Sequence, residues 1–97
     1  MSDEPVILIT VLKVKPGKQD ALIALLKQNI DAVIRTLHGW KTTRLIAAQD
    51  GTGVVIYSEW ATAAAIGAMR SDPRMQAYFP RFMELASLES IIGSAVL

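Results

Sequence analysis

The chain has 97 residues, a net charge near +1 and no cysteine, and 52% of its residues are hydrophobic. This length predicts one domain, residues 1–97, which buries about two thirds of its unfolded surface. Without cysteine there are no disulfides, thiolate metal ligands or cysteine nucleophiles. Lys and Arg are spread along the chain without a basic stripe, so we expect no nucleic acid partner.

The apolar residues form no run close to the roughly 18 that a membrane span needs. We therefore expect no membrane association, and the apolar excess should lie in a core, a subunit interface or a ligand cavity. The chain starts with Met1-Ser2-Asp3-Glu4-Pro5, which is acidic and lacks the basic start of a signal peptide. These features predict a cytoplasmic protein.

The first predicted element is a strand from Val6 to Lys15, with apolar side chains on both faces. Leu8, Thr10, Leu12 and Val14 share one face, and Ile7, Ile9 and Val11 share the other. A strand that is apolar on both sides should be covered on both sides. Helices of so small a domain cover one face, so the other face predicts a homodimer.

A helix from about Lys18 to Leu37 follows Pro16-Gly17, because apolar residues recur there at spacings of three and four. They are Leu22, Leu25, Leu26, Ile30, Val33, Ile34 and Leu37. The only histidine, His38, stands before Gly39 and is better explained as a cation at a helix end than as a base or ligand. One imidazole without clustered partners forms neither a metal site nor a triad.

The second half predicts a hairpin, two helices and a strand. Strands at Trp40–Ala48 and Val54–Trp60 flank a turn at Asp50-Gly51-Thr52-Gly53. Thr62 should cap a helix through Met69, and Asp72 should cap another with Pro73 in its first turn and a kink at Pro80. Leu88–Leu97 is the last predicted strand. This order is typical of a ferredoxin-like split βαβ fold, an α+β domain with a four-stranded antiparallel sheet.

The candidate site is the end of the third strand. Trp60 closes that strand immediately before the helices, where a large amphipathic ring is a plausible pocket wall. The later helices carry large, soft apolar side chains that suit either a core or a cavity lining. These are Met69, Met75, Tyr78, Phe79, Phe82 and Met83. Arg81 adjoins them and is either an anchor for an anionic or phenolic ligand or a solvated charge.

Several segments together resemble one family. The run Asp50–Trp60 is similar to that of the antibiotic biosynthesis monooxygenase family, and Pro73-Arg74-Met75-Gln76-Ala77 extends the likeness. Val14-Lys15-Pro16-Gly17 and Gly39-Trp40 also fit, so the resemblance covers nearly the whole chain. It implies a dimeric α+β barrel, and it is strongest toward small polyketide-tailoring oxygenases. The superfamily also holds haem-degrading enzymes, other small enzymes and members of unknown function.

The resemblance also implies a chemistry. Tailoring members oxidise polycyclic phenols to quinones with O₂ and without metal or flavin. They use an asparagine and a tryptophan four residues apart on the third strand. Trp60 matches the tryptophan and is the candidate catalytic residue, whereas Ile56 occupies the asparagine position and cannot donate a hydrogen bond.

The haem-degrading branch of the superfamily fits less well. It uses an asparagine on the first strand, then a tryptophan and a haem-ligating histidine on the later helices. Those positions correspond to Thr10, Met69 and either Phe79 or Tyr78, and none of these residues matches. Together with the lack of a metal-ligand cluster or phosphate loop, this predicts no bound haem, metal or flavin.

Two functional hypotheses remain open. The first is a cofactor-independent monooxygenase that oxidises an aromatic, phenolic or polyketide-like small molecule with O₂. In that case Thr10, Ile56, Met69, Tyr78, Phe79 and Phe82 would line the pocket, with Arg81 beside them. The alternative is a non-catalytic ligand-binding or structural dimer with a degenerate site, which Ile56 favours.

Overall fold

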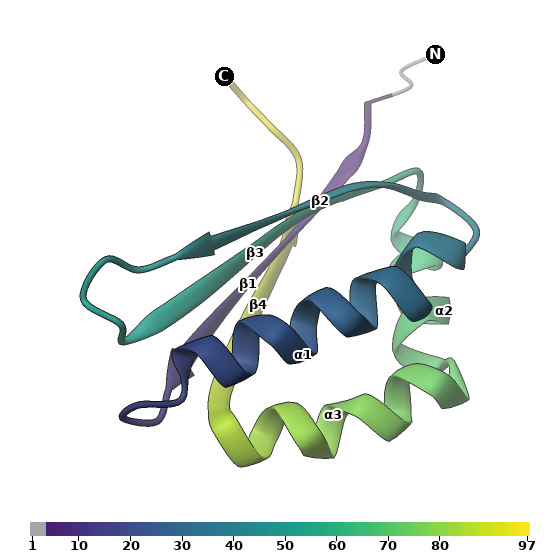
Figure 1. Ribbon diagram of the computed structural model, residues 1–97. Helices are drawn as coiled ribbons and strands as arrows, with labels where there is room; N and C mark the ends of the chain where they lie inside the picture. Colours follow the sequence, from purple (N-terminus) through teal and green to yellow (C-terminus); the bar gives the residue numbers. More distant parts are fainter. Residues whose placement is uncertain (1–3) are drawn as a thin grey trace.

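The structure, a computed structural model, describes residues 4–97 as one antiparallel sheet with helices along one face (Figure 1). The acidic start at residues 1–3, on which the cytoplasmic prediction partly rests, lies outside the described residues. The elements are β1 (Val6–Val14), α1 (Gln19–Ala32), the short 3-10 helix η1 (Ile34–Thr36), β2 (Trp40–Ala47), β3 (Gly53–Trp60), α2 (Ala63–Ser71), α3 (Pro73–Leu85) and β4 (Ala86–Gly93). The sheet order is β2-β3-β1-β4, which confirms the ferredoxin-like α+β prediction.

The register of the sheet sets which side chains face the helices. In the centre, Thr10 of β1 pairs with Ile56 of β3 on one side and with Ser90 of β4 on the other. Leu8 and Leu12 lie on the same face as Thr10 and are buried. The alternation predicted for the first strand is therefore present, and Trp60 lies on the helix-covered face.

Local capping in the second half follows the predictions. Thr62 Oγ1 accepts a hydrogen bond from the backbone N–H of Ala65 (3.1 Å), and Asp72 Oδ1 accepts one from that of Arg74 (2.8 Å). Such side chains satisfy donors that a helix start leaves free. These two caps fix where α2 and α3 begin.

Gly39 joins the first helical region to β2 and has a positive φ of 87°. A Cβ atom at this position would lie 2.6 Å from the Cβ of Ala65 in α2. Both the backbone conformation and the close approach therefore require glycine. This contact brings the start of β2, and with it Trp40, against α2.

Two predicted boundaries were wrong. The helix expected from Lys18 to Leu37 is interrupted, because Val33 leaves helical geometry (φ −125°, ψ −61°) and only the short η1 follows. Val33 and Ile34 are both buried, so packing of two β-branched side chains outweighs continuation of the helix. His38 is exposed and lies after η1 rather than at the end of α1.

The last strand was also misplaced. It was expected at Leu88–Leu97 but spans Ala86–Gly93, directly after α3. Its pairing with β1 runs from Ala86 opposite Val14 to Gly93 opposite Ile7. Since β1 begins at Val6, the residues after Gly93 have almost no partner strand left. Pro80 lies inside α3, which continues to Leu85; the kink remains a prediction.

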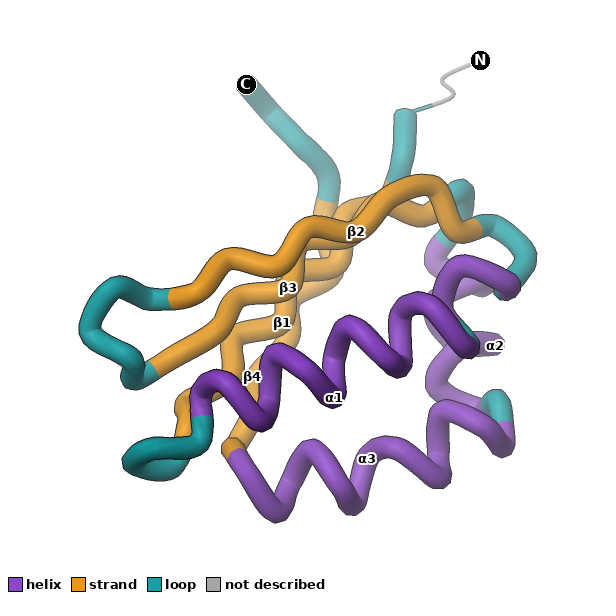
Figure 2. The backbone as a smooth tube through the Cα atoms, in the orientation of Figure 1, coloured by secondary structure: helices purple, strands orange, loops and turns teal. Residues whose placement is uncertain are grey.

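The two faces of the sheet are in different environments (Figure 2). On one face, α1, α2 and α3 bury the side chains of Leu8, Leu12, Val54 and Trp60. The other face carries no helix among residues 4–97. There Val11, Ile46 and Ile91 are 41%, 55% and 69% exposed. We call this second surface the open face.

Candidate functional site

A cavity of about 80 Å³ lies between the sheet and the helices. All four strands and all three helices contribute to its wall. The sheet supplies Leu8, Thr10, Leu12, Thr43, Ile56, Ser58, Trp60 and Leu88, and the helical layer supplies Leu26, Asn29, Ile30, Ile34, Met69, Met75, Phe79 and Phe82. A mostly apolar lining with a few polar groups is the usual character of a small-molecule site.

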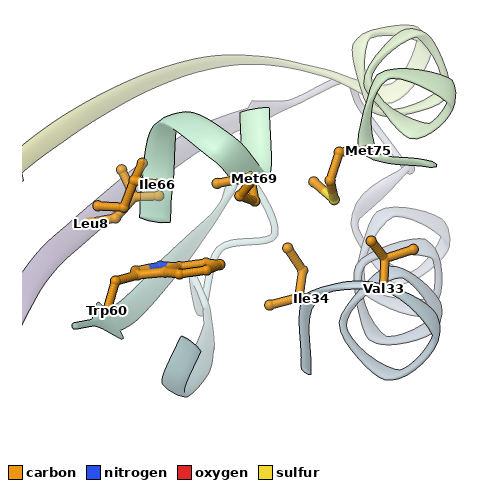
Figure 3. Packing of buried hydrophobic residues seen from close by; sticks show 7 residues of the cluster. All are labelled: Leu8, Val33, Ile34, Trp60, Ile66, Met69 and Met75. Atoms are coloured by element: carbon orange, nitrogen blue, oxygen red, sulfur yellow. The ribbon is translucent and has the colours of Figure 1, made fainter. Parts of the chain in front are cut away.

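Trp60 lines this cavity and is only 1% exposed. Its ring extends from β3 toward Ile34 and Met69, which come from η1 and α2 (Figure 3). Its Nε1–H donates to Ser58 Oγ at 3.1 Å, and Ser58 Oγ in turn donates to the carbonyl of Leu8 at 3.3 Å. The indole N–H is therefore already used, so Trp60 presents an apolar ring to the cavity.

The sequence predictions identified part of this wall. Of the residues proposed for the site, those that line the cavity are Thr10, Ile56, Trp60, Met69, Phe79 and Phe82. Tyr78 and Arg81 are not part of the lining. Phe79 and Phe82 are three residues apart on α3 and share a face. Tyr78 is partly buried and packs against Phe82 at the edge of that face, and Arg81 is exposed.

Tyr78 and Arg81 instead contact each other. The Tyr78 ring stacks on Phe82 with centroids 5.8 Å apart, and the Arg81 guanidinium lies 5.2 Å from the centre of the Tyr78 ring. Arg81 itself is exposed. It can make a cation–π contact there, but its position outside the wall gives it no contact with the cavity.

Sequence reasoning missed Thr43 and two buried polar residues of the wall, Asn29 and Ser58. Both are only 3% exposed. Asn29 lies three residues after Leu26 and four before Val33, so a polar residue stands within the apolar stripe of the helix. Ser58 lies between Ile56 and Trp60 on the same face of β3. Each could have been found as a polar residue at a position whose periodicity predicts burial.

An open groove on the surface adjoins the cavity. It is lined by Arg70, Phe79, Met83, Leu88 and Ser90, and it shares Phe79 and Leu88 with the cavity. Arg70 donates to Ser90 Oγ at 3.0 Å across this groove, from α2 to β4. Phe79 and Leu88 thus border both the cavity and the groove, and Arg70 lies on the groove side.

Shifted titratable groups lie outside the cavity. On the open face, Tyr57 donates to the Glu59 carboxylate at 3.0 Å, and this hydrogen bond raises the pKa of Tyr57. At the start of α3, the Arg74 side chain lowers the pKa of Asp72 by hydrogen bonding. Among residues 4–97, no three His, Asp or Glu side chains gather as metal ligands. The polar chemistry of the cavity therefore comes from neutral side chains.

Comparison with known proteins identifies the family. The sequence pattern of antibiotic biosynthesis monooxygenases matches residues 5–81. The chain belongs to the antibiotic biosynthesis monooxygenase family. It is 36% identical over 72 residues to tetracenomycin-F1 monooxygenase of Streptomyces glaucescens, a match that covers 74% of this chain. The match covers only 64% of that longer relative.

Solved structures agree on the fold of this family member. SnoaB, a cofactor-independent oxygenase from Streptomyces nogalater, superposes with a TM-score of 0.87 at 15% identity, over 97% of this chain and 95% of its own. The Mycobacterium tuberculosis protein Rv0793 superposes with a TM-score of 0.83 at 23% identity, over 96% of each chain.

In the part of the chain that the structure describes, no helix is long and apolar enough to cross a membrane.

Proposed function

We propose that this family member is a cofactor-independent monooxygenase that oxidises an aromatic, phenolic small molecule with O₂. The observation that carries the proposal is the place of Trp60. Its buried side chain lines a largely apolar cavity, at the position where the resemblance sets a tryptophan beside the substrate. Membership of the family and the likeness to tetracenomycin-F1 monooxygenase support the same reaction class.

The reaction needs no external reductant when the substrate is an anthrone-like phenol. One ring CH₂ loses two hydrogens and gains one oxygen atom to become a quinone carbonyl. The second oxygen atom takes the two hydrogens and leaves as water. The substrate anion supplies the electrons, so the protein must orient the ring, exclude water and stabilise an oxyanion. Trp60, Met69, Phe79 and Phe82 would serve the first two tasks.

The size of the cavity limits what fits without movement. Its volume of about 80 Å³ is roughly half that of an engineered apolar cavity of about 150 Å³ that binds benzene. A substrate with several rings would therefore require Phe79 and Leu88 to separate and join the cavity to the surface groove. Methionine side chains in the wall, Met69 and Met75, can adapt their shape to such a ligand.

A non-catalytic ligand-binding dimer is the second candidate. Ile56, which pairs with Thr10 in the centre of the sheet, offers no hydrogen bond to an oxyanion. The Trp60 N–H is also engaged with Ser58. An apolar site with these properties could bind a ring without activating it toward O₂.

Either function would be carried out by a homodimer formed through the open face. Val11, Ile46 and Ile91 supply exposed apolar area there. Covering such area contributes roughly 25 cal/mol per Å², which over a standard interface is enough for association at micromolar concentration. The same dimer contact would shield the open face of the sheet from solvent.

Oxygen consumption with anthrone and simple hydroxynaphthalenes tests the catalytic proposal. Trp60→Phe should slow the reaction, and Ile56→Asn should accelerate it by about a hundredfold, because one added donor to an oxyanion is worth roughly 3 kcal/mol. Circular dichroism must first show that both variants are folded. If both variants fold and neither changes the rate of oxygen consumption, the oxygenase proposal is rejected and the binding function remains.

A further inference from the structure

We propose that Asn29 is the residue that binds the ligand's oxygen atom in this cavity. The inference rests on the proposed use of the cavity as a small-molecule site and adds a specificity-determining residue to it. Asn29 projects from α1, on the wall opposite the sheet, and is 3% exposed. It therefore places a primary amide inside an otherwise largely apolar space.

The present partner of this amide is a weak one. Asn29 Nδ2 donates to the sulfur of Met75 on α3 at 3.2 Å, which is the only side-chain hydrogen bond of Asn29 within residues 4–97. A thioether is a poor acceptor, and the amide offers two N–H donors and one carbonyl. Buried amides are normally better satisfied. A carbonyl or phenolate oxygen would be a stronger acceptor than the sulfur.

Three other polar side chains line the wall. Thr10 lies in the centre of the sheet on β1, and the remaining two, Ser58 and Thr43, are already committed to tryptophan side chains. Ser58 Oγ accepts from Trp60 Nε1, and Thr43 Oγ1 accepts from Trp40 Nε1 at 2.8 Å. These hydroxyl groups hold the two indole rings in place. Asn29 differs because its donor points at a flexible side chain, Met75, that can move aside.

The arrangement predicts an exchange on binding. The ligand oxygen takes the Asn29 N–H, and the Met75 thioether leaves that position and vacates volume beside the ring. Asn29 on α1 would thus supply the hydrogen-bond donor that Ile56 on β3 cannot supply. The ligand oxygen would point toward α1 rather than toward β3. The favoured ligand is a compact apolar ring that carries one accepting oxygen.

A pair of rings of the same shape tests this. Cyclopentanone and methylenecyclopentane differ by an oxygen in place of a CH₂ group. Binding of each is titrated by NMR, with the side-chain amide of Asn29 and the labelled methyl group of Met75 as reporters. We expect wild type to prefer the ketone by about tenfold, the value of one net hydrogen bond, with shifts of both reporters.

Asn29→Leu keeps the volume and removes the amide, so the ketone preference should disappear while the hydrocarbon still binds. Gln28→Leu is the matched control, because Gln28 is the exposed amide next in sequence, and it should keep the preference. Equal binding of both rings to wild type, or a preference that survives Asn29→Leu, would overturn the role of Asn29.

The outcomes separate this inference from the proposed function. A cavity in wild type that binds neither ring would overturn the role of Asn29, whereas the proposed function would still be decided by the oxygen-consumption assay. A ketone preference that depends on Asn29, in a protein without oxygen consumption, would support Asn29 and reject only the catalytic proposal. The wild-type shifts of the Asn29 amide decide the question even if Asn29→Leu does not fold.

Discussion

The two faces of the sheet are built from the same strands and differ in what covers them. On β1, Leu8 and Leu12 face the helices and are buried. Val11, which lies between them in the sequence, faces outward and is 41% exposed. Both faces carry apolar side chains, so the hydrophobic effect favours covering these side chains on both. The comparison teaches that the helices of one chain cover one face, and the proposed dimer would cover the other.

The first prediction compares one side chain from each face. Phe82 lies on the covered side, where it is 4% exposed and in the cavity wall. Phe82→Ala should lower the free energy of unfolding by about 3–5 kcal/mol, because it removes a buried ring and leaves a void. Ile91→Ala on the open face should cost less than about 0.5 kcal/mol in the monomer.

Urea denaturation at two protein concentrations separates the two effects. The loss from Phe82→Ala should be the same at both, since the ring packs within one chain. The loss from Ile91→Ala should grow with concentration, because a dimer stabilises the fold by mass action. A concentration-independent loss of several kcal/mol from Ile91→Ala would show that the open face is covered within the monomer.

The second prediction adds a charge to the open face. Ile91→Glu should weaken dimerisation by at least about a hundredfold, because an unpaired carboxylate would be buried at the interface. Ala68→Glu, at an exposed position of α2, is the control and should change association little. Sedimentation velocity at micromolar concentration measures both. A wild-type monomer there, or an unchanged Ile91→Glu dimer, would contradict the proposed assembly.

Periodicity and capping residues predicted most of the fold. The alternation in Val6–Lys15, the Asp50–Gly53 turn and the caps at Thr62 and Asp72 are local signals, and each matches a local structure. The long helix was predicted to continue to Leu37, but α1 ends before Val33. There the deciding factor is tertiary packing of buried β-branched side chains, which a local pattern does not contain.

The cavity wall was less predictable than the fold. Strand alternation correctly places Thr10, Ile56 and Trp60 on one face. Which side chains of α3 reach the cavity depends on how the helix is rotated, and this rotation leaves Tyr78 and Arg81 out of the wall. The amide of Asn29 meets the cavity through the packing of α1 against α3, a contact between segments far apart in sequence.

The third prediction concerns how stability depends on pH, a smaller effect, and it tests Asp72 at the start of α3 separately from Tyr57 on the open face. Hydrogen bonding to Arg74 lowers the pKa of Asp72 in the folded protein. The folded state therefore binds this proton less tightly than the unfolded state. The resulting stability is present above the unfolded pKa of about 3.9 and is lost as pH falls through the lower folded value. Asp72→Asn should flatten this acid limb.

Tyr57 on the open face has the opposite sign. Its hydrogen bond to Glu59 raises its pKa, so the folded state holds the proton more tightly. Its contribution is complete below the unfolded pKa of about 10 and is lost as pH rises through the higher folded value. Tyr57→Phe should therefore flatten only the alkaline limb of a stability-against-pH curve, and Asp72→Asn only the acid limb.

Because Asp50 also has a lowered pKa, through its hydrogen bond from Thr52, Asp50→Asn should account for acid dependence that remains in Asp72→Asn. An alkaline limb unchanged by Tyr57→Phe would mean that the Tyr57–Glu59 contact does not couple to folding, and that the polar part of the open face contributes little to its stability.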